Sequence, residues 1–78
     1  MLFRSLIRGR NVFIWGARHE GYAAHLALTR HGIIPSGYID SSPSLAGTSA
    51  FGLSIAEPSI FFKKNSSEDS FIIVASGF

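Results

Sequence analysis

The chain contains no cysteine among its 78 residues, and no apolar run approaches the length of a membrane span. The absence of cysteine excludes a disulfide framework and any zinc or redox site built on thiolates. A membrane-spanning helix needs roughly 20 consecutive apolar residues, so we expect no span. A chain without cysteine also suits the reducing cytoplasm, which is the predicted location.

Charged residues are scarce as well, at 15% of the chain, whereas hydrophobic residues make up 46%. This composition argues against disorder, and the length allows one small domain. The net charge is only +2, although Arg4, Arg8, Arg10 and Arg18 all precede the first acidic residue. We interpret these arginines as solvated flanks of a lead-in helix at residues 2–8, and we expect no nucleic-acid partner.

Apolar segments alternate with helix-like segments along the chain. Helices are predicted at residues 19–31, ended by Gly32, and from Pro58 to 64, whereas residues 41–52 have loop composition. The alternation predicts a small three-layer Rossmann-like α/β fold with a parallel sheet of about four strands, in which the second and last strands flank the first. The predicted strands are 11–15, 34–39, a short edge strand at 53–55, and 71–75.

The faces of this sheet need helical cover. In the helix at 19–31, the spacing of Tyr22, Ala23, Leu26 and Ala27 predicts a buried stripe against the sheet. A parallel strand needs cover on both faces, and no helix follows the last strand. We therefore expect an incomplete domain, completed by the remainder of a longer polypeptide or by a homo-oligomeric partner.

The first strand runs into a turn bounded by two glycines. We expect Gly16 to adopt backbone angles closed to other residues and Gly21 to let the helix pack close to the strand. The first amides of that helix point outward and attract a phosphate or another anion. Asp40 ends the second strand 24 positions after Gly16, near the roughly 20-residue spacing at which an acid meets ribose hydroxyls. The pattern predicts nucleotide binding.

Arg18 stands in the middle of this turn, where the dinucleotide fingerprint has a glycine. Its side chain hinders a diphosphate lying flat on the turn, whereas its guanidinium group suits a phosphate contact. His19 begins the helix, and Ser76 follows the last strand, where open parallel sheets bind ligands. The candidate ligand-binding residues are Gly16, Ala17, Arg18, His19, Gly21, Asp40 and Ser76.

No catalytic or metal site is predicted. His19, His25 and His31 are six residues apart, which spreads them around a helix instead of gathering them on one face. The chain has no Gly-x-Ser-x-Gly elbow and no Walker lysine loop. We therefore expect a chain that is not catalytic by itself, with a transferase as the enzyme of which it would form part.

From Asn11 to about Ala75 the chain resembles the N-terminal domain of the sialic-acid O-acetyltransferase family, sugar acyltransferases that join a small Rossmann-like domain to a left-handed β-helix. The resemblance implies a nucleotide-sugar binder that holds the nucleotide between the glycine turn and Asp40. The family often has Gly-Ala-x-Gly-His-Gly in the turn, and this chain lacks the inner glycine. The features that carry the resemblance are Gly16-Ala17, Gly37-Tyr38-Ile39-Asp40, Pro43, Gly47, Gly52-Leu53-Ser54-Ile55 and Pro58.

Three functions stay open at this point. The first is a nucleotide-sugar-binding module of a sugar-modifying or surface-polysaccharide biosynthesis enzyme. The second is the NAD(P)- or S-adenosylmethionine-binding half of a redox enzyme or methyltransferase. The third is a degenerate Rossmann-like module that binds no ligand and serves in oligomerisation or docking. Similar layouts precede sugar epimerase/dehydratase enzymes and occur in some glycosyl- and methyltransferases, so the resemblance identifies the architecture better than the ligand.

Overall fold

The computed structural model describes residues 9–65 and 69–75. The predicted lead-in helix at 2–8 and the candidate Ser76 lie outside these residues. The strand β1 (Asn11–Trp15) and the helix α3 (Pro58–Lys64) have the predicted bounds. The other described elements are α2 (His19–Arg30), β2 (Gly37–Ile39), β3 (Ser49–Ala50), β4 (Leu53–Ala56) and β5 (Ser70–Val74).

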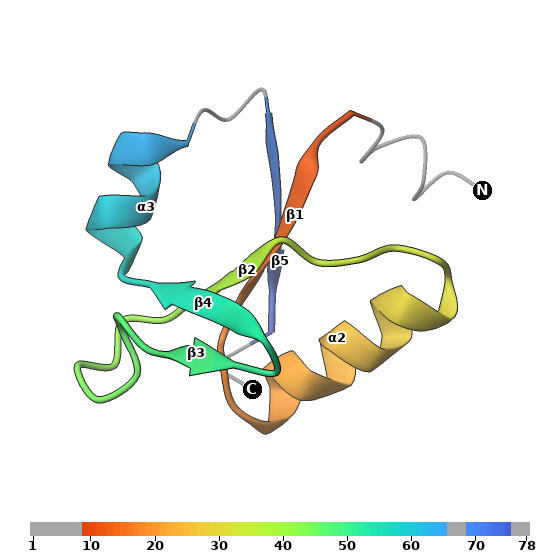
Figure 1. Ribbon diagram of the computed structural model, residues 1–78, viewed down its shortest axis with the longest axis horizontal. Helices are drawn as coiled ribbons and strands as arrows, with labels where there is room; N and C mark the ends of the chain where they lie inside the picture. Colours follow the sequence, from red (N-terminus) through yellow and green to blue (C-terminus); the bar gives the residue numbers. More distant parts are fainter. Residues whose placement is uncertain (1–8, 66–68, 76–78) are drawn as a thin grey trace.

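The described strands form one twisted sheet with the order β3-β4-β2-β1-β5 (Figure 1). Strands β2 and β5 flank β1 and run parallel to it, which confirms the predicted neighbours of the first strand. Strand β4 runs parallel to β2, whereas β3 is antiparallel to β4. The predicted fold class is confirmed as a small α/β fold, with a sheet that is mostly parallel.

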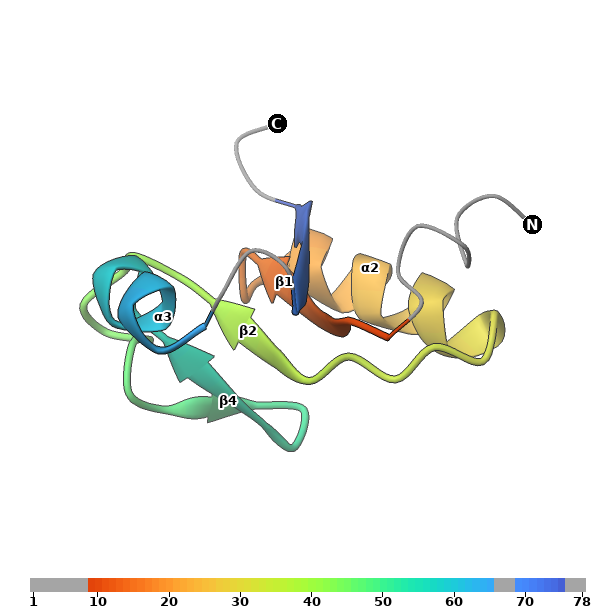
Figure 2. The ribbon, with the colours of Figure 1, turned by 90° about the horizontal axis from the view of Figure 1, so that it is seen from above.

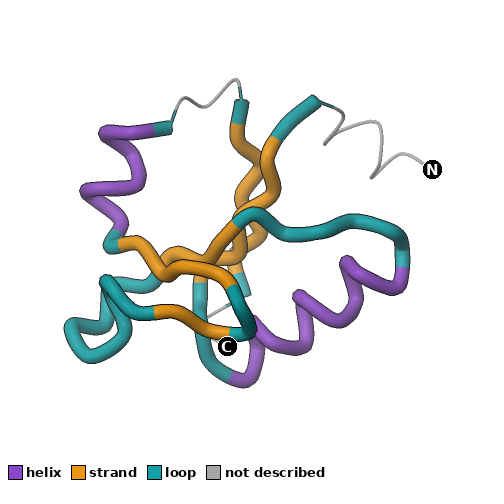
Figure 3. Tube along the Cα trace, viewed as in Figure 1, coloured by secondary structure: helices purple, strands orange, loops and turns teal. Residues whose placement is uncertain are grey.

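The region before β4 differs from the prediction. Residues 41–52, predicted as a loop, contain β3, which pairs with β4 on the side where a sheet edge was expected. The two strands are joined by Phe51 and Gly52, whose φ angles are +52° and +81°. Positive φ at both positions is typical of a two-residue hairpin turn, for which Asn-Gly is the usual sequence. Phenylalanine in the first position does not fit this preference, so the sequence does not predict the hairpin that Figure 3 shows.

The two helices lie on opposite sides of the strands (Figures 1 and 2). On the side of α2, Ile14 pairs in register with Tyr38, and both belong to the buried core together with Leu28 of the helix. On the other side, the rings of Phe13 and Phe61 meet edge to face with centroids 4.7 Å apart. Successive side chains of a strand point to opposite faces, so β1 supplies apolar side chains to both layers.

The predicted buried stripe of α2 is wrong. Tyr22 and Leu26 are 42% and 41% exposed, and Ala23 and Ala27 are also exposed. The face of α2 that packs against the sheet consists instead of residues three and four positions apart, as expected for an α-helix. This face consists of buried Gly21 and Leu28 with half-buried Ala24 and His25 between them.

His25 accounts for the wrong prediction of the buried face of α2. Its ring Nδ1 lies 2.7 Å from the hydroxyl oxygen of Tyr38, so a polar residue occupies a position on the sheet-facing side. A pattern that sorts residues into apolar and polar scores histidine as a solvent-facing position. The hydrogen bond satisfies both polar groups and permits their burial.

Strand β2 is shorter than the predicted 34–39 because pairing with β1 begins only at Gly37. Pro35 has no N–H group for a ladder, and Ile34 is 78% exposed. The end of α2 agrees with the prediction, because Gly32 follows the helix with a φ of +76°. In the described part of the chain, neither helix has the length and apolar character that crossing a membrane requires.

Candidate functional site

The turn after β1 brings the backbone of the strand and of α2 very close together. Gly16 has a φ of +119°, which a side chain would strain, and its N–H donates to the carbonyl of Ile39 at 2.8 Å. A Cβ built on Gly21 would overlap the carbonyl oxygen of Gly16 and lie 2.9 Å from its carbonyl carbon. The predicted structural roles of both glycines are therefore confirmed.

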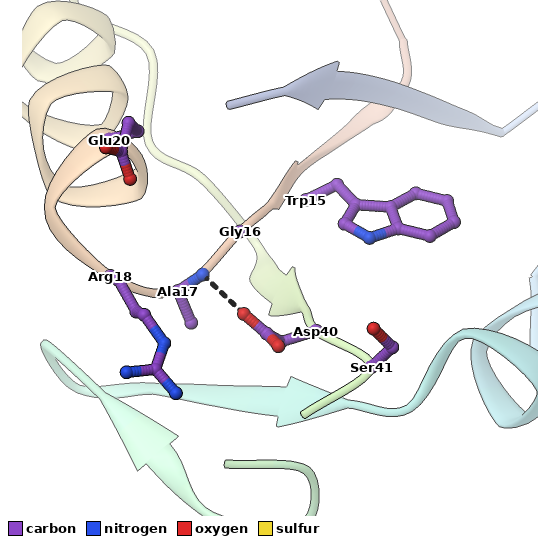
Figure 4. A pocket seen from close by; sticks show the side chains of 7 residues that line it. All are labelled: Trp15, Gly16, Ala17, Arg18, Glu20, Asp40 and Ser41. Atoms are coloured by element: carbon purple, nitrogen blue, oxygen red, sulfur yellow. Dashed lines mark hydrogen bonds between the residues drawn. The ribbon is translucent and has the colours of Figure 1, made fainter. Parts of the chain in front are cut away.

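A hydrogen bond to the side chain of Asp40 connects this turn to the end of β2. One carboxylate oxygen, Oδ2, accepts a hydrogen bond from the backbone N–H of Ala17 at 3.0 Å (Figure 4). The other, Oδ1, accepts from the backbone N–H of Ser42 at 2.8 Å. A carboxylate has about four acceptor positions, so two remain for a ligand. Asp40 thus holds the site together as well as lining it.

A pocket of about 230 Å³ opens beside this contact, and we call it the turn pocket. It lies at the carboxyl ends of β1 and β2, where parallel sheets bind their ligands. In Figure 4, Arg18 and Glu20 come from the start of α2, and Trp15 comes from the end of β1. The pocket is lined by Trp15, Gly16, Ala17, Arg18, Glu20, Asp40 and Ser41.

Arg18 is the exposed cation of the turn pocket. Its φ of −112° is open to any residue, so the turn does not require glycine at this position. The guanidinium Nη2 is 3.5 Å from the hydroxyl oxygen of Ser42, a long contact that leaves most of its five donors available. A planar guanidinium with free donors is well suited to an anionic oxygen ligand.

A second, larger cavity of about 480 Å³ adjoins the same arginine. We call it the aromatic groove, and it is lined by Arg18, His19, Tyr22 and Phe51. The rings of Tyr22 and Phe51 are stacked, with centroids 4.4 Å apart and planes inclined by 21°. His19, predicted to share the turn, therefore lines the aromatic groove and not the turn pocket.

The structure gathers four predicted residues, Gly16, Ala17, Arg18 and Asp40, around the turn pocket, and it buries Gly21 behind the turn. Sequence reasoning missed Trp15, Glu20 and Ser41 as lining residues, although each is directly adjacent in sequence to a predicted residue. Tyr22 and Phe51 were missed because no local pattern brings a helix and a distant hairpin together. Within the described ranges, no group of three His, Cys, Asp or Glu side chains could hold a metal ion.

The phenol of Tyr38 lies beneath this region and is 1% exposed. Its burial raises the pKa above the ordinary value of 10.0, and the nearby Tyr22 adds to the shift. A raised pKa means that folding favours the neutral phenol, so this contribution to stability is complete below about pH 10 and declines as the pH rises above it.

Tyr38→Phe should lower the free energy of unfolding by about 1 kcal/mol near neutral pH, because the hydrogen bond with His25 is lost. Above about pH 10 the difference from the wild type should shrink, since only the wild type loses stability through this phenol. Urea denaturation of both proteins across this pH range measures the effect. A constant difference up to the alkaline limit of folding would contradict it.

Comparisons with known proteins add no information on function to that of the fold and the site. The predicted resemblance to the sugar acyltransferases gains no support from them and stays a prediction. No protein-family model, no curated protein and no solved structure matches this chain.

Proposed function

We propose that this chain is a non-catalytic nucleotide-binding module and that its ligand is a nucleotide sugar. The observation that carries the proposal is the turn pocket, in which an exposed arginine and an acid face one cavity at the carboxyl ends of two parallel strands. Open parallel sheets bind nucleotides at this edge. A nucleotide sugar also agrees with the family resemblance, which places the nucleotide between the glycine turn and Asp40.

The charges of the turn pocket suggest how such a ligand is oriented. Asp40 and Glu20 would repel a phosphate, so the phosphates belong beside Arg18 and the first amides of α2. Sugar hydroxyls are donors, and they match the two acceptor positions left on Asp40. The sugar of the ligand then lies at the acid and its diphosphate at the arginine.

Arg18 disfavours the pose in which a dinucleotide lays its pyrophosphate flat on the turn. In the dinucleotide fingerprint a glycine at this position lets the pyrophosphate approach the backbone, and here a long side chain stands in its place. S-adenosylmethionine is the second candidate, because it has a ribose and a cationic sulfonium but no phosphate. Glu20 and Asp40, which both line the turn pocket, would favour that cation.

Titration calorimetry with UDP-glucose, NAD and S-adenosylmethionine tests the proposal. We expect UDP-glucose to bind, and Arg18→Ala to weaken its binding about tenfold through loss of a charge-assisted contact worth about 1.4 kcal/mol. Arg30→Ala is the matched control, since Arg30 is an exposed arginine in the last turn of the same helix. It should leave the affinity unchanged.

Other outcomes would count against the proposal in different ways. Binding of S-adenosylmethionine alone would establish the second candidate. The absence of binding by all three compounds to the folded protein would favour the docking module that needs no ligand. Equal affinities of wild type and Arg18→Ala for UDP-glucose would remove Arg18 from the site.

A further inference from the structure

Phe51 stands at a backbone position that disfavours it. Its φ of +52° is the only positive value among the described residues other than glycine. A left-handed conformation costs a residue with a Cβ about 1–2 kcal/mol, and two-residue turns of this kind prefer asparagine, aspartate or glycine in the first position. An aromatic residue held in such a turn suggests that its ring has a use that offsets the strain.

The ring of Phe51 is only partly buried by its neighbours. It stacks on Tyr22 and meets the edge of His25 at a centroid distance of 6.2 Å, which ties the β3–β4 hairpin to α2. Even so, Phe51 is 54% exposed and Tyr22 is 42% exposed. The two side chains therefore present open aromatic surface to the aromatic groove.

Arg18 joins the aromatic groove to the turn pocket, because its side chain lines both. Figure 4 shows its guanidinium extending from the start of α2 toward the strands of the β3–β4 hairpin. The ribose joined to a phosphate at Arg18 can therefore direct its base into the groove, where two exposed aromatic rings lie. The part of a nucleotide that suits such a surface is the planar base, and each base stacked on an aromatic side chain gains about 1–3 kcal/mol.

We propose that the aromatic groove is the nucleobase subsite of this protein, with Phe51 and Tyr22 as its stacking surface. The inference rests on the proposed nucleotide binding and adds where the base lies and which residues hold it. Stacking tolerates any base, so this subsite contributes affinity and little choice among bases.

The pair of uridine monophosphate and ribose 5-phosphate tests the subsite, since the two compounds share the ribose phosphate and differ by the base. We expect the wild type to bind uridine monophosphate at least tenfold more tightly, in calorimetry on the full chain, a ratio that corresponds to about 1.4 kcal/mol. Phe51→Asn should reduce this ratio at least about threefold, because only Tyr22 remains to stack on the base, and should leave the affinity for ribose 5-phosphate unchanged. Asparagine suits the turn, so this variant keeps the hairpin.

Ile34→Asn is the matched control, because it removes an apolar side chain that is 78% exposed and does not line the groove. It should keep the tenfold ratio. A wild type that binds both compounds equally, or a Phe51→Asn protein that keeps the full ratio, would overturn the subsite while the phosphate contact of Arg18 stands. Failure of both compounds and of UDP-glucose to bind would overturn the proposed function and the subsite with it.

Discussion

Gly21→Ala should lower the free energy of unfolding by about 3 kcal/mol, the upper end of the usual cost of overpacking. The added Cβ would overlap the carbonyl oxygen of Gly16, and a ring carbon of Tyr38 would lie 3.3 Å away. Backbone atoms cannot move aside as a side-chain end can, so α2 would have to shift away from the sheet. Urea denaturation followed by circular dichroism measures the change.

A loss of stability on this substitution would be opposite to the usual effect of alanine in a helix. An alanine that replaces glycine inside a helix ordinarily stabilises it by roughly 0.5–1 kcal/mol. Gly47→Ala is a useful comparison, because Gly47 has a φ of +86° and an added Cβ there would meet no atom within 4 Å. It should cost only the left-handed strain of about 1–2 kcal/mol. A Gly21→Ala protein as stable as the wild type would show that α2 does not need this close approach.

Asp40→Ala should destabilise the protein by about 3 kcal/mol. Each hydrogen bond to a charged group contributes about 1.5–3 kcal/mol, and two backbone N–H groups, those of Ala17 and Ser42, lose their acceptor. Partial exposure of the carboxylate places the total toward the lower end, because water can replace part of the lost contact. The midpoint of urea denaturation reports the loss.

Two further variants separate hydrogen bonding from charge. Asp40→Asn keeps one acceptor oxygen and turns an NH₂ group toward the second N–H, so its stability should lie between those of the wild type and Asp40→Ala. Glu20→Ala removes an exposed acid from the same pocket and should cost less than about 1 kcal/mol. If Asp40→Asn were as stable as the wild type, the two hydrogen bonds would contribute little.

These expectations affect how binding experiments on the site are interpreted. A loss of nucleotide-sugar affinity in Asp40→Ala would combine a loosened turn with a missing sugar contact, since the carboxylate holds the turn and lines the pocket. Arg18 has an exposed side chain with one long polar contact to Ser42, so its replacement disturbs the fold much less. Arg18→Ala is therefore the more direct probe of the ligand.

Local features of this chain could be predicted where a local cause was sufficient. The apolar run of β1, the proline at the start of α3 and the glycine after α2 each act through the backbone of a few neighbouring residues, and the structure agrees with all three. The Gly16 turn belongs with them, because its sharp reversal follows from glycine itself.

The features that were missed depend on contacts between distant segments. The rotation of α2 is set by the packing of Gly21 against Gly16 and by the hydrogen bond between His25 and Tyr38, and a stripe of apolar residues reveals neither contact. The stacking of Phe51 on Tyr22 similarly joins a hairpin to a helix that lies far away in sequence.

Apart from β3, the sequence by itself determined the order of strands and helices, the parallel neighbours of β1 and the position of the glycine turn with its following acid, because these depend on local backbone preferences and on the handedness of strand crossovers. Only the tertiary structure decided which face of α2 is buried, that Asp40 closes the turn, and that an aromatic groove adjoins Arg18. The physical reason is that side-chain packing and hydrogen bonding join residues by distance in space, which the spacing of residues along the chain does not record.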